Sequence, residues 1–95
     1  MGPAIAKATA WSKYTGTYTW KHVDAEVLVV NGELTMINAD APNPWDSRVR
    51  LTPVGPHTFK MSGGPNDGEL LKFDVDQTGA AMKFTASSYY RIRKR

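Results

Sequence analysis

The chain has 95 residues, of which 41% are hydrophobic and 11% aromatic, and it contains no cysteine. This length suits one domain and this apolar content suits a packed core, so the composition excludes wholesale disorder. Without cysteine, neither a disulfide framework nor a thiolate metal site is available. The longest apolar run, residues 27–30, is far too short to span a membrane as a helix.

The net charge of +3 is concentrated at the end of the chain, where Arg91, Arg93, Lys94 and Arg95 lie within five residues. Removing these four charges from +3 leaves −1 for the rest of the chain. Such a short basic run is typical of a solvated chain end or an edge strand, so it disfavours nucleic-acid binding. Residues 1–8 lack a basic region followed by an apolar core, and we expect no signal peptide in this chain. The compartment stays open.

The N-terminal residues 1–12 are rich in alanine and lack alternation, so we expect a flexible or partly helical lead-in before a single domain over residues 13–95. From Tyr14 onward the pattern has a period of two. Tyr14, Gly16, Tyr18 and Trp20 share one face, with threonines between them on the other face. This alternation predicts the first strand.

A hairpin is predicted around Asn31 and Gly32, which separate the apolar run 25–30 from a second segment, residues 33–38. Asn-Gly supplies the two positive φ angles of a type I′ turn, so these segments should pair as antiparallel strands. Residues 39–47 contain two prolines and predict a loop, because proline donates no hydrogen bond to a strand ladder.

Five further alternating segments predict strands: residues 48–52, 57–61, 70–75, 81–86 and 89–94. Turns are expected at residues 53–56 and 76–79, and a flexible loop at residues 62–68. In the segment 81–86 we expect Met82 to share a face with Phe84 and Ala86. In the last segment we expect the tyrosines to pack inside and the arginines to face water.

About eight short strands at near-regular spacing, with no amphipathic helix, predict an all-β fold, a small antiparallel meander barrel. Strands this short make a narrow barrel, so we expect side chains to fill its interior. The residues expected in the core are Val49, Leu51, Phe59, Phe73, Phe84 and Ile92.

No catalytic residue, metal ligand or cofactor site is predicted. His22, Asp24 and Glu26 would share a face of a strand, but no second histidine or cysteine lies nearby, which favours a solvated turn. His57 alternates with buried positions and is expected at the rim or in the core of the barrel. The chain has no Gly-x-Ser-x-Gly or Ser-x-x-Lys motif, and therefore no recognisable serine nucleophile.

Two kinds of binding surface are compatible with the pattern. Trp45, in a proline-rich loop, either caps the barrel mouth or anchors a partner surface. The candidate interaction or ligand residues are Trp45, Tyr18, Trp20, Phe59 and Arg91. The alternative is a stand-alone barrel for a small apolar ligand, lined by Tyr18, Trp20, Phe59, Phe73 and Phe84, which would need an internal cavity.

The order of several short motifs resembles a known family. Gly16-Thr17-Tyr18 opens the first strand, and Asn31-Gly32-Glu33-Leu34 forms the hairpin. Then follow RVRLTPVG at residues 48–55, LKFDVDQTG at residues 71–79 and YRIR at residues 90–93. This succession, over residues 14–94, is similar to the C-terminal lipocalin-like accessory domain of β-lactamase-related serine hydrolases and peptidases.

The resemblance implies a lipocalin-like barrel that shapes or shields a neighbouring active site or mediates assembly. Its partner would be a catalytic serine hydrolase domain in the same or a parent chain, and the parent family is often bacterial and exported. Because Ser-x-x-Lys is absent, no catalytic residue is carried over. The sequence therefore predicts a non-catalytic accessory or interaction domain.

Overall fold

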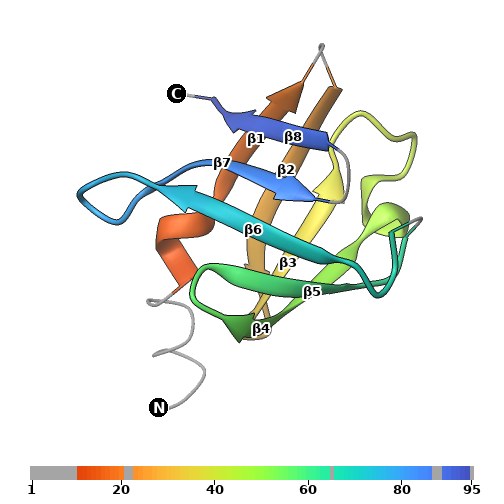
Figure 1. Cartoon of the computed structure of the whole chain (residues 1–95). Helices are drawn as coiled ribbons and strands as arrows, with labels where there is room; N and C mark the ends of the chain where they lie inside the picture. The colour runs from red at the N-terminus through yellow and green to blue at the C-terminus, as the bar shows by residue number, and fades with distance from the viewer. Residues whose placement is uncertain (1–10, 21–22, 65, 87–88, 95) are drawn as a thin grey trace.

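The computed structural model of the protein describes residues 11–20, 23–64, 66–86 and 89–94, which form one closed antiparallel barrel (Figure 1). Each strand pairs with its neighbours in the sequence, and the last pairs with the first. The strands are β1 (Gly16–Trp20), β2 (Val23–Val30), β3 (Glu33–Asn38), β4 (Val49–Gly55), β5 (Thr58–Ser62), β6 (Leu70–Val75), β7 (Ala81–Ala86) and β8 (Tyr89–Arg93). The predicted all-β meander barrel is confirmed.

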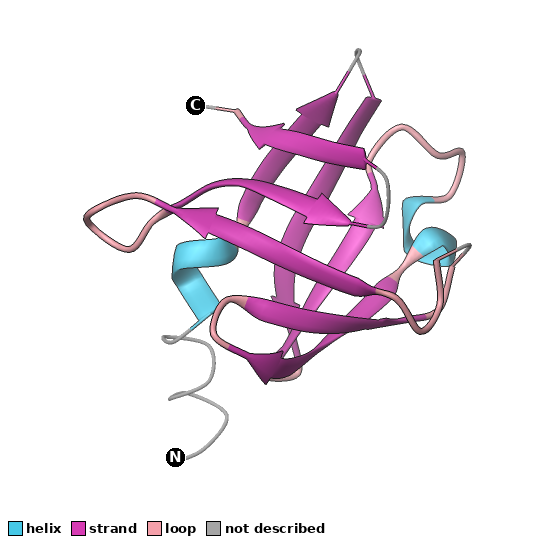
Figure 2. Ribbon diagram, in the orientation of Figure 1, coloured by secondary structure: helices cyan, strands magenta, loops and turns pink. Residues whose placement is uncertain are grey.

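Two short 3-10 helices are the helical elements of this part of the chain, η1 (Ser12–Tyr14) and η2 (Pro44–Ser47) (Figure 2). η1 precedes β1, and η2 lies in the loop between β3 and β4. Among the described residues, no helix has the length and apolar character needed to cross a membrane. Residues 1–10 of the expected lead-in lie outside the described residues.

The β2–β3 hairpin has the turn that its sequence predicts. Asn31 has a φ of 52° and Gly32 a φ of 80°, the two positive angles of a type I′ turn. The flanking residues Val30 and Glu33 are paired directly across the hairpin. This turn fixes the register that places Val27 and Leu34 in the core.

The turn between β4 and β5 lies later than predicted. β4 continues through Pro53 to Gly55, and His57, with a φ of 54°, lies in the turn itself. Pro53 is opposite Phe59, and the register shifts immediately after it. A proline is tolerated at such an irregularity because a ladder hydrogen bond is already interrupted there. The expected turn at residues 53–56 is therefore partly wrong.

Five of the six predicted core residues are buried, with exposed fractions of 7% or less: Val49, Leu51, Phe59, Phe73 and Phe84. The prediction for Ile92 is wrong, since this side chain is 52% exposed. The pairing of β8 with β7 gives the reason. Arg91 lies opposite Phe84, and directly opposed residues share a face of the sheet, so Arg91 follows Phe84 to the inner face and Ile92 points outward.

The same register overturns the expected orientation of the basic segment. Tyr89 is partly buried against the core, whereas Tyr90 is 45% exposed. Arg91 and Arg93 lie on the same face of β8 as Tyr89, the inner face, and both are half-buried. The last strand closes the barrel with its arginines on the inner side, contrary to the prediction.

A bulge in β7 overturns the predicted position of Met82. Asp74 pairs with Lys83 and Val75 with Ala81, so Met82 is the extra residue between two successive pairs. As a result Ala81 is buried and Met82 is 50% exposed. An alternation read from the sequence cannot show this extra residue.

Aromatic side chains fill the interior, as predicted for a narrow barrel. The ring of Phe73 is stacked on Tyr14 at 4.6 Å between centroids and lies 5.7–5.9 Å from Tyr18, Phe59 and Phe84. All five side chains are at most 3% exposed. The interior is therefore a packed aromatic core.

One end of the barrel is closed by η1. Trp11, expected in the lead-in, packs with its ring 5.4 Å from Phe59, and Tyr14 lies 5.3 Å from the same ring. The Tyr14 hydroxyl is 2.8 Å from His57 Nδ1, and the Tyr18 hydroxyl donates a hydrogen bond of 2.7 Å to the Tyr14 carbonyl. These contacts fix η1 against the β4–β5 turn. We call the opposite end of the barrel, where β1, β3 and β5 end, the mouth.

Candidate functional site

The mouth holds a small apolar pocket of about 190 Å³. It lies where β2 begins, β3 ends, β4 begins and β5 ends, so strand ends supply its floor. The floor residues are Ala25, Met36, Val49 and Met61. The rim consists of Ile37 and of more polar residues from the surrounding loops and strand ends: Asp24, Asn38, Ser47, Asn66, Tyr89 and Arg91.

Hydrogen bonds hold the rim loops in place. The Ser47 hydroxyl accepts a bond of 2.7 Å from the Asn38 amide and donates one of 2.6 Å to the Pro44 carbonyl, which ties η2 to the end of β3. Across the mouth, the Asn66 side-chain amide donates to the Tyr89 hydroxyl at 3.2 Å. This second bond ties the β5–β6 loop to β8, so the mouth has a preorganised shape.

Charged groups of both signs lie at the rim. Arg91 Nη1 donates to the Val23 carbonyl at 2.6 Å, and its guanidinium lies 5.6 Å from the centre of the Tyr89 ring. Lys94 Nζ is 3.1 Å from Asp24 Oδ2. Hydrogen bonds from Thr19 and Lys94 lower the pKa of Asp24 below its ordinary value, so this carboxylate stays charged. The apolar floor is thus bordered by one cation and one anion.

Trp45 lies outside the mouth, on the adjoining outer surface of the barrel. Its side chain is 45% exposed, and the Arg48 guanidinium stacks over its ring at 4.8 Å while donating to the Trp45 carbonyl at 3.1 Å. Trp45 and Arg48 line a groove of about 260 Å³ together with Thr35 and Arg50 of the β3–β4 surface. Of the two alternatives for Trp45, the structure therefore excludes a cap over the mouth pocket.

A second groove, of about 450 Å³, lies beside the first and extends from Asp46 of η2 to the end of β5 and the start of the β5–β6 loop. Arg48 and Arg50 line both grooves, and Ser62 and Gly63 line the second. The β5–β6 loop therefore contributes to two sites: Asn66 borders the mouth pocket, and Gly63 borders the second groove. We call the mouth pocket with these two grooves the loop face.

The candidate residues from the sequence divide into two groups. Trp45 and Arg91 belong to the loop face, and Trp20, 40% exposed, ends β1 at the mouth end of the barrel. Tyr18 and Phe59 are at most 1% exposed and belong to the aromatic core, so they cannot form a surface for a partner.

Sequence reasoning missed most of the mouth. Met36 and Met61 occupy inner-face positions near strand ends, and their alternation with Leu34 and Phe59 gave a detectable signal. That signal shows that a methionine faces inward but not that both lie at the same end. Arg48 was visible as an outward residue, but its stacking on Trp45 depends on the geometry of η2.

The remaining candidates for chemistry have structural roles or fall outside the described residues. His22 is not described, and Glu26 accepts a hydrogen bond of 2.6 Å from the Thr17 hydroxyl. In the described part of the chain, no three histidine or acidic side chains are grouped as metal ligands. Asp76 Oδ1 accepts hydrogen bonds from the Thr78 amide and hydroxyl, as expected of turn chemistry.

The comparisons with known proteins give no identification, because neither a family model nor a curated protein matches the chain. The fold class thus rests on the structure, and the function rests on the geometry of the loop face and on the motifs.

Proposed function

We propose that this domain is a non-catalytic accessory module that binds a protein partner through the loop face. The module resembles the one appended to β-lactamase-like serine hydrolases, and its role is to shape or shield a neighbouring active site or to mediate assembly. The catalytic serine hydrolase domain of the same or a parent chain is the partner that this resemblance implies.

The packed interior is the observation that carries the proposal. A barrel that encloses a small molecule needs a cavity of roughly 300–1,000 Å³. Here Tyr18, Phe59, Phe73 and Phe84, expected to line such a cavity, contact one another and are at most 1% exposed. The mouth pocket, about 190 Å³, is large enough for one apolar side chain of a partner. This geometry favours a surface interaction over the alternative, a stand-alone small-ligand barrel.

The composition of the loop face also suits protein recognition. Tryptophan, tyrosine and arginine are the residues that most often dominate interface energies, and Trp45, Arg48, Tyr89 and Arg91 all lie here. Methionines adapt to varied partner side chains, which fits Met36 and Met61 on a pocket floor.

The C-terminal cations do not form a free basic tail for nucleic acid. Arg91 donates to the Val23 carbonyl, Arg93 donates to Thr15 and Ala81, and Lys94 pairs with Asp24. Arg95 lies outside the described residues. These internal contacts support the protein-interaction proposal over a nucleic-acid role.

The test is methyl NMR on the full chain labelled at the methionine Cε groups, titrated with a catalytic domain of a β-lactamase-like serine hydrolase. We expect the signals of Met36 and Met61 to shift, because both line the mouth, while Met82 on the outer surface of β7 stays unchanged. Unchanged Met36 and Met61 signals at saturating partner concentration would contradict the proposal.

Two exposed tryptophans supply a matched pair of variants. Trp45→Ala should weaken partner binding about tenfold or more, as expected for a central tryptophan at an interface. Trp20→Ala removes a tryptophan of similar exposure outside the two grooves and should change affinity by less than about threefold. Equal losses for the two variants would count against the loop face.

Hydrolysis is the second measurement. The purified chain should not turn over penicillin-like substrates or short D-amino-acid peptides. Turnover that copurifies with the chain through successive columns would overturn the non-catalytic role. Saturable binding of a fatty acid that shifts Phe73 and Phe84 signals would favour the small-ligand alternative.

A further inference from the structure

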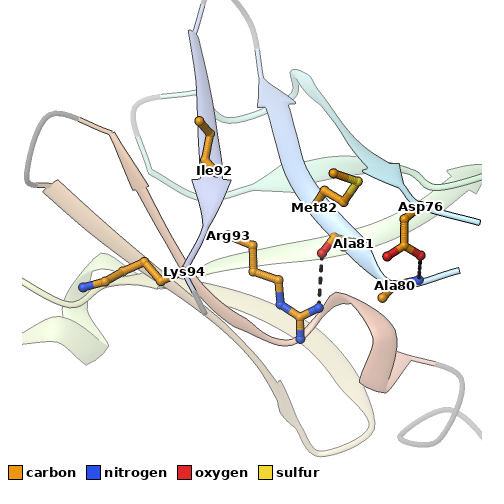
Figure 3. A pocket seen from close by; sticks show the side chains of 7 residues that line it. All are labelled: Asp76, Ala80, Ala81, Met82, Ile92, Arg93 and Lys94. Carbon is orange, nitrogen blue, oxygen red and sulfur yellow. Dashed lines mark hydrogen bonds between the residues drawn. The ribbon is translucent and has the colours of Figure 1, made fainter. Parts of the chain in front are cut away.

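The closing seam of the barrel leaves a groove at the end opposite the mouth. Among the described residues β8 pairs with β1 at two positions, Tyr18 opposite Arg93 and Thr19 opposite Ile92, and its pairing with β7 stops at Lys83 opposite Ile92. β1 begins at Gly16 and β7 begins at Ala81, whereas β8 ends at Arg93. The first residues of β1 and β7 therefore extend beyond the end of β8. The groove is about 430 Å³ in volume (Figure 3). It is lined by Asp76, Ala80, Ala81, Met82, Ile92, Arg93 and Lys94.

The Arg93 guanidinium bridges the gap between these two strands. Its Nη1 donates to the Ala81 carbonyl at 3.1 Å and its Nη2 donates to the Thr15 carbonyl at 2.7 Å (Figure 3 shows the first bond). Gly16 makes room for it, because a Cβ at this position would lie 2.9 Å from Arg93 Nε. The guanidinium is therefore held in one place by backbone groups.

Among the described residues this cation has no counter-ion. Both of its hydrogen-bond partners are neutral carbonyls, and within the described ranges it forms no ion pair with a carboxylate. The other cation of the groove, Lys94, is already paired with Asp24 at 3.1 Å. Asp76 lies at the edge, where its Oδ1 accepts three hydrogen bonds from Thr78 and Ala80. Arg93 thus contributes a fixed positive charge that no carboxylate among the described residues neutralises.

Two apolar side chains line the same groove from the outer face of β7 and β8, whereas the Arg93 side chain leaves β8 on the opposite face (Figure 3). Met82 is 50% exposed and Ile92 is 52% exposed, on neighbouring strands. The bulge in β7 turns Met82 outward, and the register of β8 turns Ile92 outward. The departure of Ile92 from the predicted core and of Met82 from its predicted face therefore contribute to the same exposed apolar surface.

We propose that this groove binds a carboxylate joined to a short apolar chain. The carboxylate faces Arg93, whose charge it neutralises, and the apolar chain covers Met82 and Ile92. A free short-chain carboxylic acid and the C-terminal carboxylate of a peptide present the same chemistry. The site is separate from the loop face and does not depend on the proposed partner interaction.

The experiment is a titration of the full chain, labelled at the methionine methyl groups, with hexanoate and with hexanamide as its neutral isostere. Hexanoate should shift Met82 saturably and bind about tenfold more tightly than hexanamide, because only the acid makes a charge-assisted contact. Met36 and Met61, at the mouth, should stay unchanged. Equal affinity for acid and amide, or no saturable shift of Met82, would overturn the proposal.

A second pair of ligands distinguishes the sources of the carboxylate. N-acetyl-alanyl-leucine is compared with its C-terminal amide, which lacks the negative charge. If the peptide acid binds more tightly than hexanoate, the ligand is a chain terminus, and the reverse order indicates a free acid. Both results support the carboxylate site, provided that each acid binds more tightly than its amide.

Variants that change a charge but leave the hydrogen bonds of Arg93 in place test the site without unfolding the seam. Asp76→Asn retains the oxygen that caps the turn but removes a repelling charge, so hexanoate should bind about twofold more tightly. Asp67→Asn makes the same change at the mouth end and should have no effect. Met82→Glu should weaken hexanoate binding about tenfold, whereas Leu70→Glu, at a similarly exposed position outside the groove, should not. Equal effects of the two glutamates would contradict the site.

Discussion

The substitution Phe73→Ala should remove a large share of the stability of this domain. Phe73 is 1% exposed and its ring contacts those of Tyr14, Tyr18, Phe59 and Phe84. Loss of a fully buried phenylalanine costs about 3–5 kcal/mol, from lost apolar burial plus the cavity that remains. A domain of 95 residues has a free energy of unfolding of roughly 5–14 kcal/mol. The variant should therefore lose about a fifth or more of its stability.

Urea unfolding followed by tryptophan fluorescence measures this loss, with the m-value checked for two-state behaviour. The melting temperature should fall by roughly 15–30 °C, at about 4–8 °C for each kcal/mol. Two controls bracket the result: Phe73→Leu should cost about 1.5 kcal/mol or less, and Leu70→Ala, at a site 55% exposed, about 0.5 kcal/mol or less. A Phe73→Ala cost below about 1 kcal/mol would refute the packed aromatic core.

Three other predictions concern the turn, the alkaline limit and the basic segment. Gly32→Ala should cost about 1–2 kcal/mol in urea unfolding, since a φ of 80° strains any residue with a Cβ; no measurable cost would argue against the type I′ turn. Burial raises the pKa of Tyr18 from 10.0 to about 12, so the folded state favours its protonated form. The contribution of the buried, protonated Tyr18 to the free energy of unfolding is complete below pH 10 and is lost as the pH rises toward 12. Thermal melts measure the loss of stability, and phenolate absorbance measures the ionisation. Ionisation of Tyr18 near pH 10 in the folded protein would contradict its burial. Titration with single-stranded DNA at low salt should show no saturable binding, because Arg91 is bonded to the Val23 carbonyl and Lys94 is paired with Asp24, so that Arg93 is an isolated charge and not part of a basic surface; tight, salt-sensitive binding would contradict this.

The fold could be predicted from the sequence wherever local chemistry determines geometry. Asn31 and Gly32 specify a turn by their φ preferences alone, and the alternation around Phe59 and Phe73 places both rings inside. These signals are local, so they survive into the structure. The filled interior also follows from the sequence, because short strands give a narrow barrel.

The errors arise where one residue changes the phase of a strand. The bulge at Met82 turns outward a residue that was expected to share a face with Phe84 and Ala86, and the register of β8 exchanges Ile92 with the arginines. Both depend on pairing between strands, which a single strand's pattern does not contain. Pro53 misled for a different reason: proline is typical of turns, yet it is tolerated beside a strand irregularity.

The candidate site was less predictable than the fold because it exists only in three dimensions. Trp45 and the β5–β6 loop each stood out by composition, but only the barrel brings η2 and Asn66 to the same end. Tyr18 and Phe59 were assigned to a surface because aromatic content alone does not separate core from interface. Arg91 lines the mouth pocket, and this position depends on the register of β8.

The central claim is that the barrel is filled and that recognition takes place on its surface. Xenon binding tests it most directly, because xenon enters apolar cavities of about 150 Å³ that water leaves empty. Crystals of the chain under xenon pressure should show no xenon among the rings of Tyr18, Phe73 and Phe84. A well-occupied xenon site at that position would contradict the account and favour an internal ligand.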